Sequence, residues 1–179
     1  ITFTDHYLDI GSTLTPSSSA RTIITVTAPN STSRILSLNG DGSATTKGSI
    51  FIMQTNSLRL FETPVIFEDE LDLNTLNIYS IRNDINATTS GIESFKNGNL
   101  LNVSSSTEQS IDLGNSVTRI GGYNTNRFDG ILSEILIFDK KLTDEELQKI
   151  NLYLSIKWNL QSTIDSDGDT YSDDIDAFP

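Results

Sequence analysis

Aspartates recur at short, regular intervals in the segment DSDGDTYSDDIDAFP, residues 165–179. Numbered from Asp165, they occupy positions 1, 3, 5, 9 and 12, and Tyr171 lies at position 7, where calcium loops use a backbone carbonyl. Carboxylates this close repel one another unless a cation lies among them, and oxygen ligands without nitrogen or sulfur suit calcium better than zinc. The spacing therefore predicts a Ca²⁺ site built from Asp165, Asp167, Asp169, Tyr171, Asp173 and Asp176.

An acidic, disordered tail is the alternative interpretation of this segment, because runs of like charge are usually solvated. Apolar residues recur between the carboxylates, at Tyr171, Ile175 and Phe178, and a disordered tail does not require them. Position 6, which is Gly in an EF-hand loop, is Thr170. Since a threonine at positive φ is strained, either the turn differs from an EF-hand or its affinity for calcium is reduced.

The segment resembles one unit of a thrombospondin type 3 repeat, whose pattern D-x-D-G-D-x-x-x-D-x-x-D-x-x-P it follows through Gly168 and Pro179. The resemblance implies a calcium-binding repeat with further domains of the same chain beyond it. We therefore expect residues 1–162 to form one domain and residues 163–179 a partial repeat. The chain also opens on ITFT, as if within a strand, so we expect it to be part of a longer protein.

The composition argues against several classes of function. The net charge is −12, and half of it comes from the aspartates of residues 165–176, which makes nucleic acid an unsuitable partner. Cysteine is absent, so no disulfide, thiolate metal site or cysteine nucleophile is available. No apolar run is long enough for membrane insertion. Extracellular calcium modules bind with dissociation constants on the order of 10⁻⁴ to 10⁻³ M, so we expect a secreted or cell-surface protein, bacterial in origin.

Short alternating apolar runs, separated by turn residues, extend from residue 1 to about residue 139. This rhythm is typical of an antiparallel all-β fold. Strands are predicted at residues 21–28, 34–40, 49–54, 57–62, 75–82, about 117–121 and 128–138. Asn97-Gly98 predicts a hairpin turn, because both central residues of such a turn must tolerate positive φ. The spacing of these strands predicts a two-sheet sandwich.

One segment has a helical pattern instead. Thr143 and Glu146 form a capping box, and Leu142 can pack on Leu147 as a hydrophobic staple. The apolar face of the predicted helix then continues through Leu147, Ile150, Leu154 and Trp158. We expect this short C-terminal helix to pack at the edge of the sandwich, with Trp158 in the core and not on a sugar.

Residues 121–160, GGYNTNRFDGILSEILIFDKKLTDEELQKINLYLSIKWNL, resemble the closing segment of bacterial concanavalin A-like, laminin G-like jelly-roll domains. The matching positions are Gly130, Leu132, Glu134, Ile137, Phe138, Leu142, Thr143, Glu146, Lys157 and Trp158, with Phe95–Gly98 as a similar strand and turn. The resemblance implies an all-β, two-sheet antiparallel jelly-roll sandwich with one short C-terminal helix and, here, a calcium-loop tail. Such domains commonly bind carbohydrate or protein, and some relatives on this fold are glycoside hydrolases.

A retaining hydrolase needs two carboxylates, one nucleophile and one acid. Glu70-Leu71-Asp72 matches the first half of the laminarinase-type motif E-[IL]-D-x-x-E, but Asn74 and Thr75 stand where the second acid is needed. The one histidine, His6, has no nucleophile elbow to serve. We therefore expect no enzyme, and glycoside hydrolysis is the third hypothesis.

The candidate ligand site lies in the loop after Gly122, where donors, acceptors and one aromatic ring follow closely: Tyr123, Asn124, Asn126, Arg127 and Asp129. These groups can bond to sugar hydroxyls while the tyrosine stacks on a pyranose ring. A polar loop without a ligand is the alternative. The leading hypothesis is thus a non-catalytic, lectin-like module that binds glycan.

Two questions stay open at this point. The second functional hypothesis is a calcium-dependent adhesion domain that binds a cell-surface protein or peptide, and a structural spacer is the fourth. A second calcium site is also conceivable in other loops, at Asn39, Asp41, Asn83 and Asp84.

Overall fold

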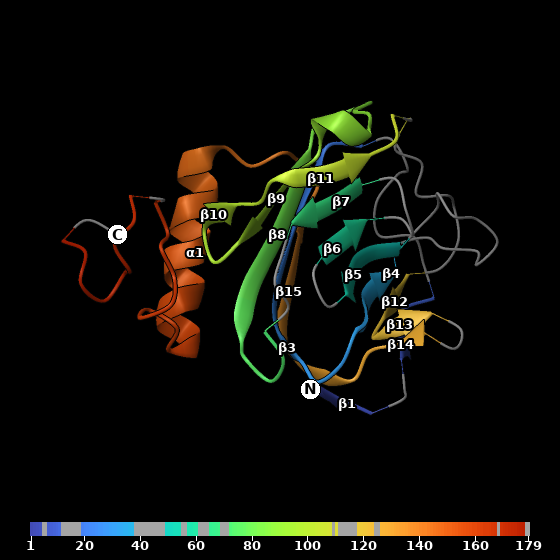
Figure 1. Ribbon diagram of the computed structural model, residues 1–179, viewed down its shortest axis with the longest axis horizontal. Coiled ribbons are helices and arrows are strands. Elements are labelled where there is room, and N and C mark those ends of the chain that lie inside the picture. The colour runs from blue at the N-terminus through green and yellow to red at the C-terminus, as the bar shows by residue number, and fades with distance from the viewer. Residues whose placement is uncertain are drawn as a thin grey trace.

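The computed structural model describes residues 1–4, 7–11, 19–37, 49–54, 57–60, 65–68, 72–108, 110, 118–123, 126–167 and 169–177. In this part of the chain two antiparallel sheets face each other, and one α-helix lies against the outer face of one of them (Figure 1). The predicted all-β, two-sheet sandwich with a C-terminal helix is confirmed.

The first sheet contains, in spatial order, β1 (Thr2–Phe3), β15 (Gly130–Phe138), β3 (Arg21–Pro29), β8 (Asn77–Asn83), β9 (Glu93–Lys96) and β10 (Asn99–Leu100). Its long central strands are rich in Ile, Val and Thr, whose branched side chains favour extended backbone. The strands predicted at residues 21–28, 75–82 and 128–138 are confirmed as β3, β8 and β15.

The second sheet contains, in spatial order, β11 (Val103–Ser106), β7 (Val65–Glu68), β6 (Ser57–Leu60), β5 (Ser49–Gln54), β4 (Ser33–Ser37), β12 (Arg119–Ile120) and β2 (Leu8–Asp9). Beside β4 lies a separate strand pair, β13 (Gly122–Tyr123) and β14 (Asn126–Arg127). The predicted β5–β6 hairpin is confirmed, with Gln54 opposite Ser57. The strands that the sequence pattern missed, β2, β7, β11, β13 and β14, have only two to four residues each, too few for a clear alternation.

β3 and β8 are buried along their whole length on both faces. Between the sheets, Ile23 and Tyr79 pack with Val65 and Phe67 of β7. On the outer face, Ile24, Val26 and Ile78 pack instead with residues of the helix and of the segments before and after it: Leu142, Leu147, Leu154 and Ile164. The middle of this sheet is thus covered by the other sheet on one side and by the C-terminal segment on the other.

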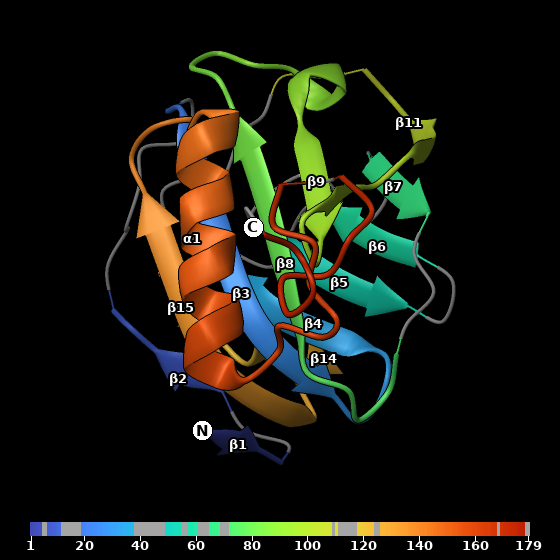
Figure 2. The ribbon, with the colours of Figure 1, turned by 90° about the vertical axis from the view of Figure 1, so that its left-hand side faces the viewer.

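Helix α1 (Asp144–Trp158) begins as the sequence predicts. Thr143 Oγ1 accepts a hydrogen bond from Glu146 N at 3.2 Å, and Glu146 Oε2 accepts one from Thr143 N at 3.0 Å, so the capping box is confirmed. Leu147 and Leu154 are buried, and Trp158 packs at the border of the same cluster. The expected position was wrong: α1 runs over the outer face of the first sheet and not at its edge (Figure 2). None of the described helices is long and apolar enough to cross a membrane.

Arg82 fastens β8 to the first turn of α1. Its guanidinium is largely buried, and Nη1 donates to the carbonyl of Leu142 at 2.9 Å. Nη2 donates to Asp144 Oδ1 and to Glu93 Oε2, both at 2.5 Å. These charge-assisted bonds fix the helix start relative to the sheet, and with it the position of the residues that α1 presents to the tail.

Candidate functional site

The tail, residues 163–177, lies against α1 and the β9–β10 hairpin (Figure 2). Ile164 is fully buried with Leu154 in the outer cluster. The hairpin turn has the predicted conformation, with φ of 53° at Asn97 and 88° at Gly98. The carbonyl of Asn97 accepts a hydrogen bond from Asp165 N at 3.2 Å, and a Cβ on Gly98 would lie only 1.7 Å from the carbonyl oxygen of Asp165. A glycine is therefore required where the turn meets the tail.

Asp173 anchors the second half of the tail. Its Oδ2 accepts hydrogen bonds from Ser155 Oγ of α1 at 2.5 Å and from Ser166 Oγ at 2.8 Å, and its Oδ1 accepts one from Ser166 N at 2.8 Å. The residue is 6% exposed. Asp173, which the spacing predicts as a metal ligand, thus holds the tail to the helix through Oδ2 and bonds within the tail through both oxygens.

Three of the predicted ligands converge. One carboxylate oxygen from each of Asp165, Asp167 and Asp169 lies within 4.8 Å of the others. Backbone N–H groups orient the carboxylates: Asp169 N donates to Asp165 Oδ1 and to Asp167 Oδ1, both at 3.1 Å, and Thr170 N donates to Asp165 Oδ2 at 2.9 Å. Thr170 has φ 84°, so the chain makes the sharp turn of a calcium loop in spite of its side chain. Hard oxygen donors at this separation suit Ca²⁺.

The remaining predicted ligands flank this group. Tyr171 N donates to Asp169 Oδ1 at 2.8 Å, while the ring of Tyr171 is exposed. Asp176 N donates to the carbonyl of Ser172 at 3.0 Å. Partial desolvation raises the pKa of Asp167 above its ordinary value, and the neighbouring negative charges of Asp169, Asp176 and Asp165 raise it further. The carboxylates of this group thus repel one another, and a bound cation would reduce the repulsion.

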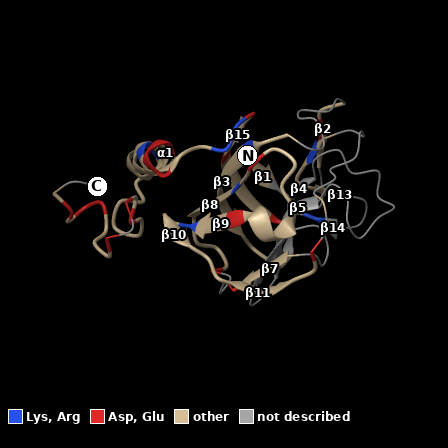
Figure 3. Cartoon of the chain, turned by 90° about the horizontal axis from the view of Figure 1, so that it is seen from above, with Lys and Arg blue, Asp and Glu red and all other residues tan. Residues whose placement is uncertain are grey.

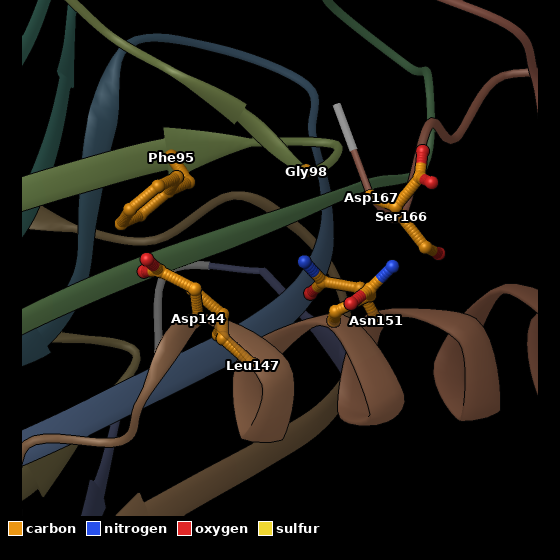
Figure 4. Close-up of a pocket in the computed structure, with 8 residues that line it drawn as sticks. Phe95, Gly98, Asp144, Leu147, Asn151, Ser166 and Asp167 are labelled. Atoms are coloured by element: carbon orange, nitrogen blue, oxygen red, sulfur yellow. The ribbon is translucent and has the colours of Figure 1, made fainter. Parts of the chain in front are cut away.

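A cavity of about 140 Å³ separates α1 from the hairpin and the tail. Figure 4 shows Asp144, Leu147 and Asn151 of α1 along one wall and Phe95, Gly98, Ser166 and Asp167 along the others. Asn151 is 2% exposed, and its buried Oδ1 has no hydrogen-bond partner. We call this space the helix–tail cavity.

Tyr7, which precedes β2, is 40% exposed, and two cations lie close to its ring. The Cζ atoms of Arg119 and Arg127 are 5.4 Å and 5.8 Å from its centroid. Arg119 Nε also donates to Asp9 Oδ2 at 3.3 Å, where β12 pairs with β2. We call Tyr7, Arg119 and Arg127 the Tyr7 cluster.

The residues of the predicted ligand loop are only partly brought together. Tyr123 pairs with Asn126 in the β13–β14 hairpin, and Asn124 lies outside the described residues. Arg127 belongs to the Tyr7 cluster, whereas Asp129 accepts a hydrogen bond from Asn30 Nδ2 at 3.1 Å. Tyr7 was missed because it is far from the loop in sequence, and Arg119 was missed because it lies just before the loop, in a predicted strand. The pairing of β2 with β12 brings the segment of Tyr7 to Arg119, and Arg127 lies near the same ring.

Other candidates have structural partners. Asn83 Nδ2 donates to the carbonyls of Ser19 and Asp84, and Asp84 lies 3.6 Å from Lys141 Nζ. Asp72 forms an ion pair with Lys96 at 3.1 Å. Four further candidates lie outside the described residues: His6, Asn39, Asp41 and Glu70.

Comparison with solved structures identifies jelly-roll-like relatives of this fold. Domain 4 of AbnA, an extracellular GH43 arabinanase from Geobacillus stearothermophilus, was solved with arabinotriose; it is 11% identical, with a TM-score of 0.56 over 81% of this chain and 72% of that one. The CBM40 of the IT-sialidase of Ruminococcus gnavus, bound to α2,3-sialyllactose, is 15% identical, with a TM-score of 0.53 over 84% of this chain and 95% of that one.

An SAP-like pentraxin from Limulus polyphemus is 13% identical, with a TM-score of 0.53 over 79% of this chain and 75% of that one. No protein-family model matches the chain. No curated protein sequence matches it either. At these identities the likeness establishes the jelly-roll-like sandwich, and two of the neighbours are domains solved with bound carbohydrate.

Proposed function

We propose that this chain is a non-catalytic, lectin-like module that binds glycan within a larger secreted or surface-attached bacterial protein. The observation that carries the proposal is the Tyr7 cluster, which presents a partly exposed aromatic ring flanked by guanidinium groups. A ring can stack on the apolar face of a sugar while N–H groups bond to its hydroxyls. The structural neighbours solved with arabinotriose and sialyllactose support the same class of ligand.

Glycan-array binding followed by titration of the strongest sugar tests this proposal. Tyr7→Ala and Arg127→Ala should each weaken binding by about 5- to 30-fold, since a stacked ring or a charged hydrogen-bond donor contributes roughly 1–2 kcal/mol. The matched control is Tyr153→Ala on α1, another exposed tyrosine with a cation, Lys157, 5.4 Å from its ring. If Tyr153→Ala weakened binding as much, or if no sugar bound, the proposed site would be wrong.

Calcium is the proposed cofactor of the tail. Asp165, Asp167 and Asp169 would supply carboxylate oxygens, and the backbone carbonyl of Tyr171 and the side chain of Asp176 are the further candidates. The ion would neutralise the repulsion that raises the pKa of Asp167. Weak calcium loops fill only where free calcium is high, which supports an extracellular location. We also propose, from the same spacing of aspartates, that the tail is part of a thrombospondin type 3 repeat.

The absence of catalysis is also a proposal. Asp72, the aspartate of the half-motif, forms an ion pair with Lys96 at 3.1 Å. The second acid of the motif is replaced in the sequence by Asn74 and Thr75. Release of reducing sugar that disappeared in Asp72→Asn would overturn this view.

The second candidate function is calcium-dependent binding of a protein or peptide. The observation that favours it is the acidic helix–tail cavity, which adjoins the carboxylates of the tail through Asp167. An array without sugar hits, combined with capture of a basic peptide, would make this the leading function.

A further inference from the structure

Asp9 lies beside the Tyr7 cluster, and two hydrogen bonds fix its carboxylate. Its Oδ1 accepts a hydrogen bond from Gly11 N at 2.8 Å, and its Oδ2 accepts one from Arg119 Nε at 3.3 Å. Gly11 has φ 73°, a conformation that glycine adopts without strain, so the chain after β2 can turn its own N–H back to the carboxylate. One oxygen of Asp9 is thus held by the backbone, and the other holds a guanidinium.

The register of the strands explains why Asp9 and Tyr7 meet the same arginine. Asp9 lies directly opposite Arg119 where β2 pairs with β12. Side chains two residues apart in an extended chain point to the same face, so Tyr7, just before β2, follows Asp9 on that face. A long side chain on the partner strand reaches both the residue opposite and its diagonal neighbour. Accordingly, Arg119 bonds to Asp9 while its Cζ lies 5.4 Å from the centroid of the Tyr7 ring.

The bond at Nε restricts the guanidinium of Arg119. This group is planar and its N–H donors point in fixed directions, so a carboxylate bonded at Nε orients the whole plane. Without that bond, the long side chain would exchange among several rotamers, and a ligand would have to order it on binding. Asp9 therefore orders Arg119 before any sugar arrives.

The fold of this edge does not depend on the side chain of Asp9. Ile10 N donates to the carbonyl of Thr118 at 2.9 Å, and β2 pairs with β12 through its backbone. The side chains of Asp9 and Arg119 are 42% and 21% exposed, and an ion pair this exposed contributes little to stability. Replacing Asp9 should therefore change the orientation of Arg119 and leave β2 in place.

We propose that Asp9 is a positioning residue of the glycan site: it holds Arg119 beside the ring of Tyr7, so that a sugar meets an ordered donor next to an aromatic surface. Asp9 itself does not touch the sugar. This inference rests on the proposed glycan function. It is independent of calcium, because the tail and β2 lie on opposite sides of the sandwich (Figure 3).

The first test needs no sugar and uses the side-chain Nε–H NMR signal of Arg119 in the whole chain, identified by its loss in Arg119→Lys. Asp9→Ala should accelerate exchange of this proton with water at least fivefold, whereas the backbone amide signals of residues 8–10 and 118–120 should remain dispersed. Asp9→Asn keeps an acceptor oxygen but no charge, so its exchange rate should lie between the two. Unchanged exchange in Asp9→Ala, or collapse of the amide signals of residues 8–10, would overturn the positioning role.

The second test measures affinity for the strongest sugar of the glycan array. Asp9→Ala should weaken binding about 3- to 10-fold, the effect of ordering one long side chain on binding. In a chain that already carries Arg119→Ala, the same change should have no further effect, because Asp9 acts through that arginine. The matched control is Asp84→Asn, an exposed aspartate 3.6 Å from Lys141 Nζ, which should bind as the wild type does.

The outcomes separate this role from the glycan function. Equal affinity of the wild-type chain and Asp9→Ala for the sugar would overturn the positioning role and leave the glycan function in place. Additive losses from Asp9→Ala and Arg119→Ala would also overturn it, because Asp9 would then act by another route. A wild-type chain that bound no sugar would refute the glycan function, and this role with it.

Discussion

The indole Nε1 of Trp158 donates a hydrogen bond to Oε2 of Glu134 at 2.9 Å, across the interface between α1 and β15. Lys157 Nζ donates to the other oxygen, Oε1, also at 2.9 Å. Glu134 lies where the register of β15 shifts against β3. One carboxylate therefore holds the last turn of the helix to a bulged strand, far from the bonds that Arg82 makes to the first turn.

Glu134→Gln should lower the free energy of unfolding by about 1–2 kcal/mol, since the amide carries no charge for Lys157 and keeps one acceptor oxygen for two donors. Urea unfolding followed by the fluorescence of the single tryptophan measures it. Burial opposes ionisation of Glu134, but the hydrogen bonds from Lys157 and Trp158 outweigh it and hold its pKa below the usual value. The stabilisation by ionised Glu134 is thus fully present above the pKa of this residue in the unfolded chain, and it is lost as the pH falls through its lower pKa in the folded chain.

The difference between the wild-type chain and Glu134→Gln should accordingly shrink in acid. A difference that grew on acidification would contradict this assignment. Glu145→Gln is the control: this carboxylate pairs with exposed Lys149, and its loss should change the stability much less than Glu134→Gln does.

Gly98→Ala should destabilise the chain by about 3 kcal/mol, because it adds a Cβ at φ 88° that meets the carbonyl of Asp165. The matched control is Gly91→Ala in the short helix η1 (Thr89–Gly91), where a Cβ would lie 3.4 Å from that of Ala87. That change should remain within about 0.5 kcal/mol. Thermal unfolding of both variants measures the two losses of stability. Similar losses would mean that the hairpin and the tail are not in contact.

Asp173→Ala should release the tail from α1. It removes the acceptor of Ser166 N and Ser166 Oγ and one of the two acceptors of Ser155 Oγ, which keeps the carbonyl of Leu152, and we expect this loss to cost about 2 kcal/mol. Hydrogen exchange should accelerate at the amides of residues 164–176 and not in β3 or β8. Asp174→Ala, which removes an exposed carboxylate that accepts a hydrogen bond from Ser172 Oγ, should leave exchange unchanged.

Thr170→Gly should raise the affinity for calcium by about 3- to 10-fold. A threonine at φ 84° is strained by roughly 1–2 kcal/mol, and glycine removes this strain although it gains freedom in the unfolded chain. Calorimetric titration of Ca²⁺ measures the change. Thr163→Gly, before the acidic loop, serves as the control, and equal affinities for wild type and Thr170→Gly would argue against a metal at this turn.

Acid should weaken calcium binding at a higher pH than ordinary aspartates would require. Because desolvation and neighbouring carboxylates raise the pKa of Asp167, its proton competes with the ion earlier as the pH falls. In the metal-free chain, acid has the opposite effect and stabilises the fold. The repulsion between the carboxylates is present above the raised pKa of Asp167 and is relieved as the pH falls through it. Titrations at several pH values check both effects, and a pH-independent affinity would exclude Asp167 as a ligand.

The sequence predicted those parts of the molecule that depend on local patterns. The capping box at Thr143 and the turn at Asn97-Gly98 need only neighbouring residues, and both are confirmed. The placement of α1 over the sheet was not predictable from its apolar stripe, because a stripe specifies burial but not the surface that covers it. The Tyr7 cluster and the helix–tail cavity each require segments that are distant in sequence, so no local spacing could indicate them.

The partners of β3 have a consequence for biosynthesis. This strand near the amino terminus pairs with β8 on one side and with β15 on the other, and β15 also receives β1. Contacts between such distant segments form slowly, since the loss of chain entropy precedes the gain from pairing. On the ribosome, β3 can pair with β8 first, but its other edge stays open until β15, which ends at Phe138, has left the exit tunnel, so the nascent chain exposes a strand edge that holding chaperones can cover.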